Sequence, residues 1–232
     1  SFYGYKLDGT WKTSEAEEAK IFGAQPGDIK INCADIQRHV NADGSVYYTG
    51  FDPEGNEVTY DINNPYDDQQ AQQVLGHPQP DWTLGLTNSF TWKNFDFSMD
   101  IRSWIDFDVF NTCEMYFGLQ KENDINLLKV AYTKNKDITQ EKQLCSYWLQ
   151  DGTFLKIDAI NLGYTLPLKD KTNGLIQSLR VCGNINNVCT ITGYEGMDPE
   201  VNVIGHSAGI EWWNSGFYPR ARTYTLGVQL TF

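Results

Sequence analysis

The sequence predicts an all-β fold: the C-terminal antiparallel strands of a transmembrane β-barrel, with long extracellular loops and short periplasmic turns. Three observations support this prediction. Several segments alternate apolar and polar side chains with a period of two, the connections between them sort into short and long sets, and the last segment ends the chain on an aromatic residue. A tilted strand of roughly 9–11 residues is long enough to cross a bilayer.

The last segment, 221–232, shows the pattern most clearly. The odd positions are small or polar, whereas the even positions from Tyr224 onward are apolar: Tyr224, Leu226, Val228, Leu230 and Phe232. Because successive side chains of a strand point to opposite faces, one face of this strand is wholly apolar. We expect this face to contact lipid, and we expect the strand, ending at Phe232, to serve as the signal that the barrel-assembly machinery reads.

Four other segments repeat the alternation. Segments 82–92 and 94–108 are separated only by Lys93-Asn94, which predicts a hairpin. In 177–188, apolar or small residues at odd positions from Leu179 to Ile185 alternate with Ser178, Arg180, Cys182 and Asn184. In 154–165, Leu155 and Ile157 favour one face whereas Leu162 and Tyr164 favour the other, so a β-bulge between them is expected to shift the register.

Residues 2–11 form a weaker aromatic strand, and two short segments are helix candidates: Glu15 to Lys20 and Asp124 to Tyr132. If the final strand ends in the periplasm, the alternating strand directions put the connections 93–94 and 166–176 in the periplasm. With the same strand directions, the outer loops are 12–81, 109–153 and 189–220. Every short connection then lies on one side and every long one on the other, as is usual for outer-membrane barrels.

Aromatic residues lie near many of the expected strand ends, where interfacial girdles are found in membrane barrels. The alternative is that these side chains are ordinary core aromatics of a β-sandwich. The residues concerned are Trp82, Trp92, Phe95, Trp104, Phe107, Phe154, Tyr164 and Tyr224.

Charge and composition limit the possible functions. The net charge is −12, and residues 12–80 carry twelve Asp or Glu against four Lys or Arg. Phosphate-backbone binding needs clustered basic residues, so no nucleic acid partner is expected. The five cysteines lack zinc-site spacing and the three histidines are scattered, so we expect no metal and no cofactor. A Cys113–Cys145 bridge is possible.

The chain begins Ser-Phe-Tyr-Gly-Tyr, without an initiator Met or a signal peptide. Six strands cannot close a wide channel, and unpaired strand edges are not tolerated in lipid. We therefore expect the earlier part of a larger barrel to be missing from this sequence.

Seven motifs, in order along the chain, resemble those of the SusC/RagA-like TonB-dependent transporters of the outer membrane. They are Phe2-Tyr3-Gly4-Tyr5 with Asp8-Gly9, Pro26-Gly27-Asp28-Ile29-Lys30, Leu75-Gly76 with Pro78 and Pro80, Lys93-Asn94-Phe95-Asp96, Leu162-Gly163-Tyr164-Thr165-Leu166-Pro167, Asp198-Pro199-Glu200-Val201, and Tyr218-Pro219-Arg220 with the closing strand. After PGDIK the family usually has an acidic, Gly-containing turn. Here only a partial version, Asn41 to Gly44, follows inserted residues, which disfavours calcium binding.

The resemblance implies that 1–232 is the C-terminal part of a TonB-dependent receptor barrel of about 22 strands, whose plug and TonB-contacting segment lie N-terminal to this sequence. It implies an outer-membrane protein of a Gram-negative bacterium. It also implies import of glycans or peptides together with a SusD-like surface lipoprotein that lids the extracellular mouth. TonB itself would act through the absent N-terminal part.

The best ligand candidate is Trp212-Trp213, because two flat aromatic faces can stack on sugar rings or clamp apolar peptide groups. The alternative is that this pair packs against a neighbouring loop or the lid protein. A soluble β-sandwich carbohydrate-binding module is the rival class. The sequence contains no GxSxG, HExxH or phosphate-loop motif, so we do not expect an enzyme.

Overall fold

The computed structural model describes the chain except residues 22, 33–36, 52–55, 61–71, 122–124, 141, 143, 202–207 and 213–219. The chain divides into two compact units. Unit 1 comprises Ser1–Gln79, Asp108–Gln150 and Val201–Phe217, and unit 2 comprises Pro80–Phe107, Asp151–Glu200 and Tyr218–Phe232.

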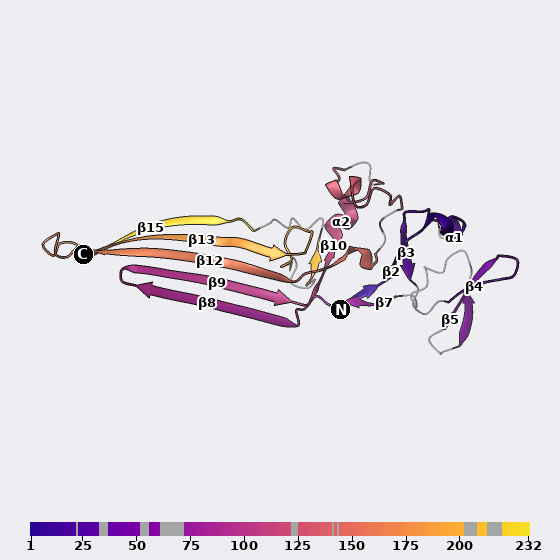
Figure 1. The fold of residues 1–232 in the computed structure, drawn as a ribbon, viewed down its shortest axis with the longest axis horizontal. Helices are drawn as coiled ribbons and strands as arrows, with labels where there is room; N and C mark the ends of the chain where they lie inside the picture. Colours follow the sequence, from indigo (N-terminus) through magenta and orange to yellow (C-terminus); the bar gives the residue numbers. More distant parts are fainter. Residues whose placement is uncertain are drawn as a thin grey trace. The chain divides into compact units, whose positions relative to one another are not determined.

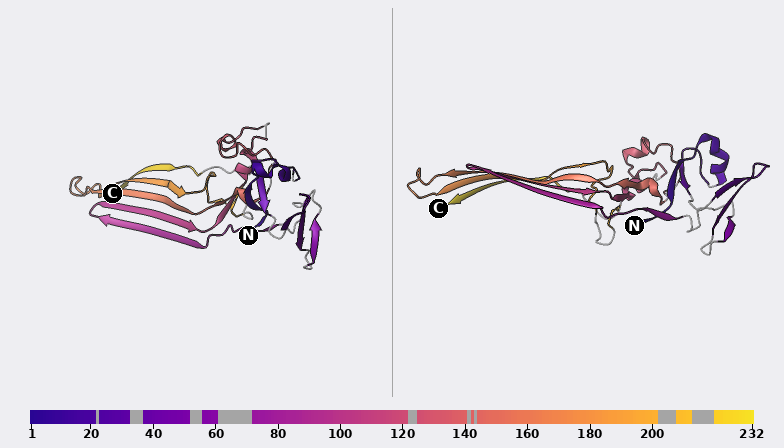
Figure 2. Two further views of the ribbon diagram at one scale, coloured as in Figure 1. Left: turned by 45° about the vertical axis from the view of Figure 1, so that its right-hand side comes forward. Right: turned by 60° about the horizontal axis from the view of Figure 1, so that its bottom comes forward.

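Unit 2 is built on one five-stranded antiparallel sheet, in the order β15-β13-β12-β9-β8 (Figure 1). The strands are β8 (Trp82–Trp92), β9 (Phe95–Ile105), β12 (Phe154–Pro167), β13 (Ser178–Thr192) and β15 (Thr223–Thr231). Figure 2 shows the twist of this sheet. The five main strand predictions are confirmed, and so is the hairpin at Lys93-Asn94, where Lys93 takes a φ of 54°.

The β-bulge expected in segment 154–165 is also confirmed. The pairing of β12 with β9 and with β13 shifts register between Ile157 and Ala159. On β13, Asn187 has a φ of 53°, a left-handed conformation that Asn tolerates better than most residues. Because of the shift, Leu155 and Leu162 reach the same face of the sheet despite their odd and even positions, and both are exposed.

The expected end of segment 94–108 was wrong. Strand β9 stops at Ile105, because Asp106 adopts a φ of 60° that turns the chain. Phe107 is then buried instead of continuing the alternation.

Unit 1 consists of short strands and helical turns. Its elements are β1 (Phe2–Gly4), β2 (Lys6–Thr10), η1 (Thr13–Glu15), α1 (Ala16–Ile21), β3 (Ile29–Asn32), β4 (Gln37–Val40), β5 (Val46–Phe51), β6 (Glu57–Tyr60), β7 (Gln73–Gly76), β10 (Asp108–Asn111), α2 (Thr112–Phe117), η3 (Lys129–Tyr132), η4 (Ser146–Trp148) and β14 (Ile210–Glu211). Strand β11 (Leu149–Asp151) lies next to β10.

The expectation that 2–11 forms another strand of the barrel was wrong. Strand β1 pairs with β7 and strand β2 pairs with β3, all within unit 1. Phe2, Tyr5 and Leu7 pack against a buried cluster, which explains why this segment is aromatic. The cluster itself contains Ile29, Ile31, Phe110, Met115, Leu119, Ile138, Cys145 and Trp148.

The helix expected at 15–20 is present as η1 and α1. For 124–132, the described residues contain only the short η3, and residue 124 lies outside the described part of the chain. Helix α2 was not expected. Asn111 precedes it, and the side chain of Asn111 accepts a hydrogen bond from the Glu114 amide at 2.9 Å, which caps the helix.

The PGDIK motif forms a tight turn in unit 1. The buried Asp28 carboxylate accepts hydrogen bonds from the amides of Thr139 at 2.6 Å, Gln140 at 3.0 Å and Gln25 at 2.9 Å. The preceding residue, Gly27, has a φ of 101°, and a Cβ there would lie 2.6 Å from the Asp137 carbonyl oxygen.

The Cys113–Cys145 bridge is not formed, because both are free thiols. Burial raises the pKa of the Cys113 thiol to about 12 and that of Cys145 to about 11. Cys182 and Cys189 are also free, while Cys33 lies outside the described residues.

We expect Gly27→Ala to destabilise unit 1 more than Gly44→Ala. Both glycines have positive φ, a conformation that costs a non-glycine residue about 1–3 kcal/mol. A Cβ at Gly44, which has a φ of 85°, would have no atom within 4 Å, so only Gly27→Ala adds a backbone clash. Urea unfolding followed by limited proteolysis of the full receptor measures the difference. Equal losses would contradict the proposed role of the close approach.

Candidate functional site: the two faces of the five-stranded sheet

One face of the unit 2 sheet is apolar and exposed; we call it the apolar face. On β15, Leu226 is 80% exposed, and on β8, Trp82 is 67% exposed. The exposed apolar side chains of this face are Trp82, Leu84, Leu86, Phe90, Trp92, Phe95, Leu155, Leu162, Val181, Ile191, Tyr224, Leu226, Val228 and Leu230. Exposing one large apolar side chain to water costs about 1.5–3 kcal/mol relative to burial, so a band of this size requires an apolar neighbour.

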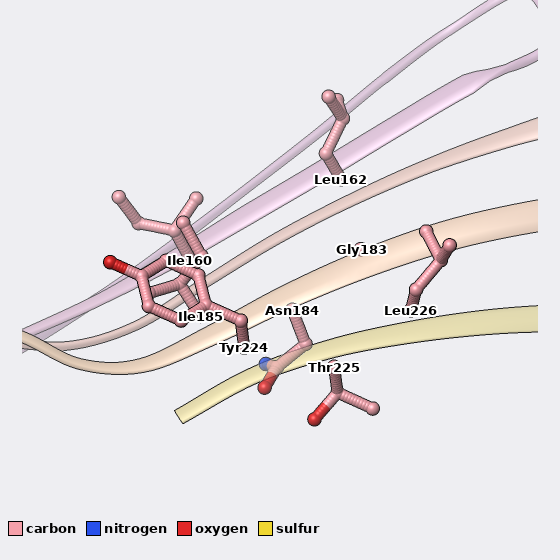
Figure 3. Close-up of a pocket in the computed structure, with 8 residues that line it drawn as sticks. All are labelled: Ile160, Leu162, Gly183, Asn184, Ile185, Tyr224, Thr225 and Leu226. Atoms are coloured by element: carbon pink, nitrogen blue, oxygen red, sulfur yellow. The ribbon is translucent and has the colours of Figure 1, made fainter. Parts of the chain in front are cut away.

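The close-up in Figure 3 shows how the alternation separates the two faces. Leu162 and Leu226 project from one side of the sheet, and Asn184 and Thr225 from the other. Leu162, Gly183 and Leu226 lie in register across three strands. Because Gly183 has no side chain, a shallow apolar groove lies between the two leucines.

The expected aromatic girdle is only partly present. Trp82, Trp92, Phe95 and Tyr224 are exposed, and Phe95 contacts Tyr164 with ring centroids 4.4 Å apart.

By contrast, Trp104, Phe107 and Phe154 pack against one another with centroids 5.5–6.2 Å apart, and Phe107 and Phe154 are buried. The girdle assignment was wrong for these three, because Trp104 and Phe154 occupy polar-face positions in the register and Phe107 follows the turn at Asp106.

The opposite face, which we call the polar face, carries a charge network. Arg102 on β9 donates two hydrogen bonds to Asp158 on β12, at 2.9 and 3.1 Å, and two to Glu200, at 2.6 and 3.0 Å. Asp158 is the extra residue of the β12 bulge, since Ile157 pairs with Ile101 and Ala159 pairs with Asp100. The bulge thus brings a carboxylate to Arg102.

Glu200 is the hub of this network. Besides Arg102, its carboxylate lies 3.1 Å from Arg220 Nη1 and 3.4 Å from Lys156 Nζ. The Lys156 side chain is only 2% exposed, and its ammonium lies 3.9 Å from Asp198. The Glu200 amide donates to the Asp198 carboxylate at 3.0 Å, which orders the DPE segment. The motif therefore places two carboxylates against three basic side chains: Arg102, Lys156 and Arg220.

Burial raises the pKa of Glu200, but hydrogen bonds from Arg102 and the charges of Arg102, Arg220 and Lys156 outweigh this effect. The pKa of Glu200 therefore lies below its ordinary value of 4.5. The stability that this carboxylate contributes is complete above the pKa of the unfolded chain, and it is lost as the pH falls through the lower pKa of the folded state.

A second ion pair crosses the polar face above Gly163. Arg180 on β13 donates to Asp96 on β9, with Nη2 and Oδ2 2.5 Å apart, and both side chains are more than a third exposed. A Cβ at Gly163 would lie 2.5 Å from the Asp96 carboxylate and 2.7 Å from Arg180. The glycine of the LGYTLP motif thus leaves the space in which this pair bridges two strands over a third.

The site residues that the sequence predicted belong to different units of the structure. Tyr224, Leu226, Val228 and Leu230 share the exposed face as expected, and the terminal Phe232 is 74% exposed. Trp212 is partly buried in unit 1, next to β14, whereas Trp213 lies outside the described residues.

The charge network was missed at the sequence level. Charged residues on the polar positions of alternating strands, such as Arg102 and Lys156, were the available signal.

Within the described residues, no group of His, Cys, Asp and Glu side chains could hold a metal ion. The helices of the same residues are all too short or too polar to cross a membrane.

Comparison with known proteins shows similarity to TonB-dependent receptors. No family model matches the chain. TonB-dependent receptor P3 of Formosa agariphila is 24% identical over 247 residues, which cover 100% of this chain and 22% of the relative. TonB-dependent receptor SusC of Bacteroides thetaiotaomicron is 27% identical over 249 residues, which cover 96% of this chain and 24% of the relative. The chain therefore spans less than a quarter of the length of these curated relatives.

Solved structures agree on the fold. A structure of the RagAB peptide transporter matches with a TM-score of 0.60 and 19% identity, covering 100% of this chain and 23% of that one. A structure of the RagAB peptide importer in the closed-closed state matches with a TM-score of 0.59. The fold is that of the barrel of TonB-dependent receptors. Over its whole length the chain is similar to a segment of SusC/RagA-like receptors, as its motifs predicted.

We expect Glu200→Gln to destabilise the full receptor by about 3 kcal/mol, because it leaves the buried ammonium of Lys156 without its nearest carboxylate. Asp100→Asn is the matched control. Asp100 also lies on the polar face, but among the described residues it accepts only an exposed hydrogen bond from Thr87 at 2.8 Å. Its loss should stay near about 0.5 kcal/mol. The temperature at which the folded band disappears on semi-native gels reports both changes, and similar values for the two variants would refute the hub role.

Proposed function

We propose that this chain forms part of the wall and mouth of an outer-membrane, TonB-dependent importer in a Gram-negative bacterium. The observation that carries the proposal is the two-sided sheet of unit 2. Its apolar face suits lipid, and its polar face, with its ion pairs, suits the interior of a barrel. Similarity to TonB-dependent receptors over the whole chain supports the same function.

The two edge strands of the sheet favour the proposal that it is part of a larger barrel. In the described part of unit 2, β8 and β15 each pair with a strand on one side only. Unpaired backbone groups cost several kcal/mol each in lipid, so further strands of a longer polypeptide would have to complete the pairing. On this proposal 1–232 is a partial barrel, with 93–94 and 166–176 in the periplasm and 12–81, 109–153 and 189–220 outside.

The cargo and the partners are proposed from the resemblance. The RagAB peptide importer among the structural neighbours favours a peptide as the transported molecule. The motif resemblance to SusC/RagA-like transporters extends the proposal to a glycan or a peptide and to a SusD-like lipoprotein lid. TonB would act through the N-terminal part of the longer protein. We propose no catalytic activity, and we propose that the strand ending at Phe232 acts as the assembly signal.

The alternative, a soluble β-sandwich carbohydrate-binding module, is disfavoured by the apolar face. A sandwich buries the inner faces of two sheets against each other. Among the described residues of unit 2, a single sheet is formed and its apolar side chains remain exposed.

Adjacent residues on β15 offer a test of the membrane assignment. We expect Leu226→Arg to reduce the amount of folded full receptor in the outer membrane, because Arg on a lipid-facing position costs about 2–4 kcal/mol near the midplane. Thr225→Arg, one residue away on the polar face, should leave the amount nearly unchanged. Quantitative immunoblots of purified outer membranes measure both, and equal tolerance of the two changes would refute the assignment of the faces.

The import function is tested by uptake. Cells that express the full receptor with its lipoprotein should accumulate labelled oligosaccharide or peptide only while TonB is present. Trp212→Ala/Trp213→Ala should reduce this uptake if the pair contacts the cargo, whereas Trp82→Ala/Trp92→Ala on the apolar face should not. Unchanged uptake and unchanged lipoprotein binding in the first variant would exclude the pair from the mechanism. Uptake that persists without TonB would refute the proposed importer.

A further inference from the structure

One position on the apolar face of the unit 2 sheet has no side chain. Gly183, in the middle of β13, pairs with Leu162 on β12 and with Leu226 on β15, so a gap lies between the two leucines. A Cβ on Gly183 would meet no atom within 4 Å. Gly163 and Gly227 differ from it, because a Cβ on either would lie less than 3.0 Å from a neighbouring side chain. The gap at Gly183 therefore makes room for no neighbouring group of the described residues.

The backbone of β13 does not require a glycine at this position either. The φ of Gly183 is not in the left-handed region, and the pairing with both neighbouring strands continues through it without a shift. A glycine inside a strand costs conformational entropy and offers no side chain for packing. Where no bulge or bend explains such a glycine, the close approach of a ligand or of another backbone is the remaining common reason. Because no described backbone atom lies near its Cβ position, the gap is available to a ligand.

The gap is part of a groove of about 440 Å³ on the apolar face (Figure 3). Ile160, Ile185 and Tyr224 lie in register across the same three strands and gather at one end of the groove. Leu162 and Leu226 flank the other end. Apart from the Tyr224 hydroxyl, these five side chains are hydrocarbon, and a hydrocarbon ligand such as an acyl chain matches them best.

A cation lies beyond the Tyr224 end of the groove. Arg222 is exposed and precedes Tyr224 by two positions, roughly 7 Å along an extended chain. Its Nε donates to the Asn187 carbonyl at 3.3 Å, and the Asn187 side chain donates to the Arg220 carbonyl at 2.7 Å. Asn187, whose φ is 53°, thus ties the segment before β15 to β13 and fixes where the Arg222 guanidinium lies.

Arg222 keeps donors for a ligand. A guanidinium has five N–H donors in a fork that matches phosphate or carboxylate oxygens. Among the contacts of the described residues, Arg222 engages only its Nε group. Its two Nη groups are therefore available to an anion at the Tyr224 end of the groove. A ligand with an acyl chain and an anionic head would match both the groove and the cation.

We infer that this groove binds one acyl chain of lipid A, the phosphorylated lipid of the outer leaflet, and that Arg222 binds its phosphate. The inference rests on the proposed function, which places the start of β15 at the extracellular side and its apolar face in lipid. The outer leaflet is then the one that meets Arg222, and lipid A carries the anionic phosphate that a guanidinium binds. Boundary lipid covers an apolar face anywhere, whereas this groove and cation would hold one molecule in one place.

The test uses the delipidated full receptor in detergent micelles, with lipid A as the probe and native mass spectrometry to count bound molecules and measure the Kd. Gly183→Leu fills the gap, and the absence of atoms near its Cβ position permits the larger residue. Arg222→Ala removes the cation. Val228→Leu, the first matched control, enlarges an apolar-face side chain outside the lining of the groove. Lys169→Ala, the second, removes an exposed cation from the turn 166–176.

We expect the wild type to bind one lipid A more tightly than any further molecules. Arg222→Ala should raise the Kd of this site about tenfold, which corresponds to about 1.4 kcal/mol, the lower range for a hydrogen bond to a charged group. Gly183→Leu should raise it by a similar factor, because the new side chain takes the place of the acyl chain. Both controls should bind as the wild type does. Dephosphorylated lipid A should bind the wild type no better than lipid A binds Arg222→Ala.

Semi-native gels check that each variant is folded. Should Gly183→Leu fail to fold, Gly183→Ala, whose Cβ meets no atom within 4 Å, should raise the Kd in the same direction. A Kd for Gly183→Ala equal to that of the wild type would then count against the groove.

Equal Kd values for the wild type, Gly183→Leu and Arg222→Ala would overturn the inference, because the bound molecule would then be boundary lipid. Equal binding of phosphatidylcholine, which has no net charge, would also overturn it. So would a wild type that binds no lipid A because a side chain of a further strand fills the groove. Uptake is measured in parallel: TonB-dependent uptake without lipid A binding would remove only this site, whereas uptake that persists without TonB would remove the importer itself.

Discussion

The backbone of β12 holds one extra residue near Asp158, and its pairing with β9 and β13 shifts at that point. Both functional faces depend on this register. Without the shift, Leu155 and Leu162 would point to opposite sides, and an apolar side chain would enter the polar face. The same bulge brings Asp158 to Arg102. One local irregularity therefore keeps the apolar face continuous and supplies a carboxylate to the charge network.

Glycines and ion pairs together shape the polar face. Gly163 leaves room for Asp96 and Arg180 to meet across β12, and Gly227 leaves room for the Cys182 thiol. The Glu200 hub gathers three basic groups within 3.5 Å, through a motif that lies beyond the end of β13. Gly163 belongs to the LGYTLP motif and has a steric role on the polar face. Glu200 belongs to the DPEV motif and has an electrostatic role on the same face. Both motifs therefore support the structure of this face, and neither specifies a cargo.

The sequence predicted most of unit 2 and little of unit 1. Alternation over ten or so residues is a strong local signal, so the five long strands, their hairpin and the bulge were predictable. Strands of three to six residues carry too little periodicity. For that reason β1 and β2 were taken for one barrel strand, and the cap of α2 at Asn111 was overlooked. Charged residues at polar strand positions were a signal for the charge network, but its pairing could not be predicted, because Arg102 and Glu200 lie 98 positions apart and only the folded chain brings them together.

By itself, the sequence determined the fold class, the two-sided character of the closing strand and the resemblance to SusC/RagA-like receptors, because these depend on local alternation and on short motifs. The tertiary structure decided which residues share a face, that Trp104 and Phe154 pack on the polar side, and that Glu200, Lys156 and Arg102 meet. The physical reason is that alternation assigns faces only relative to a strand's own register. Turns, bulges and cross-strand contacts set how the registers of different strands align.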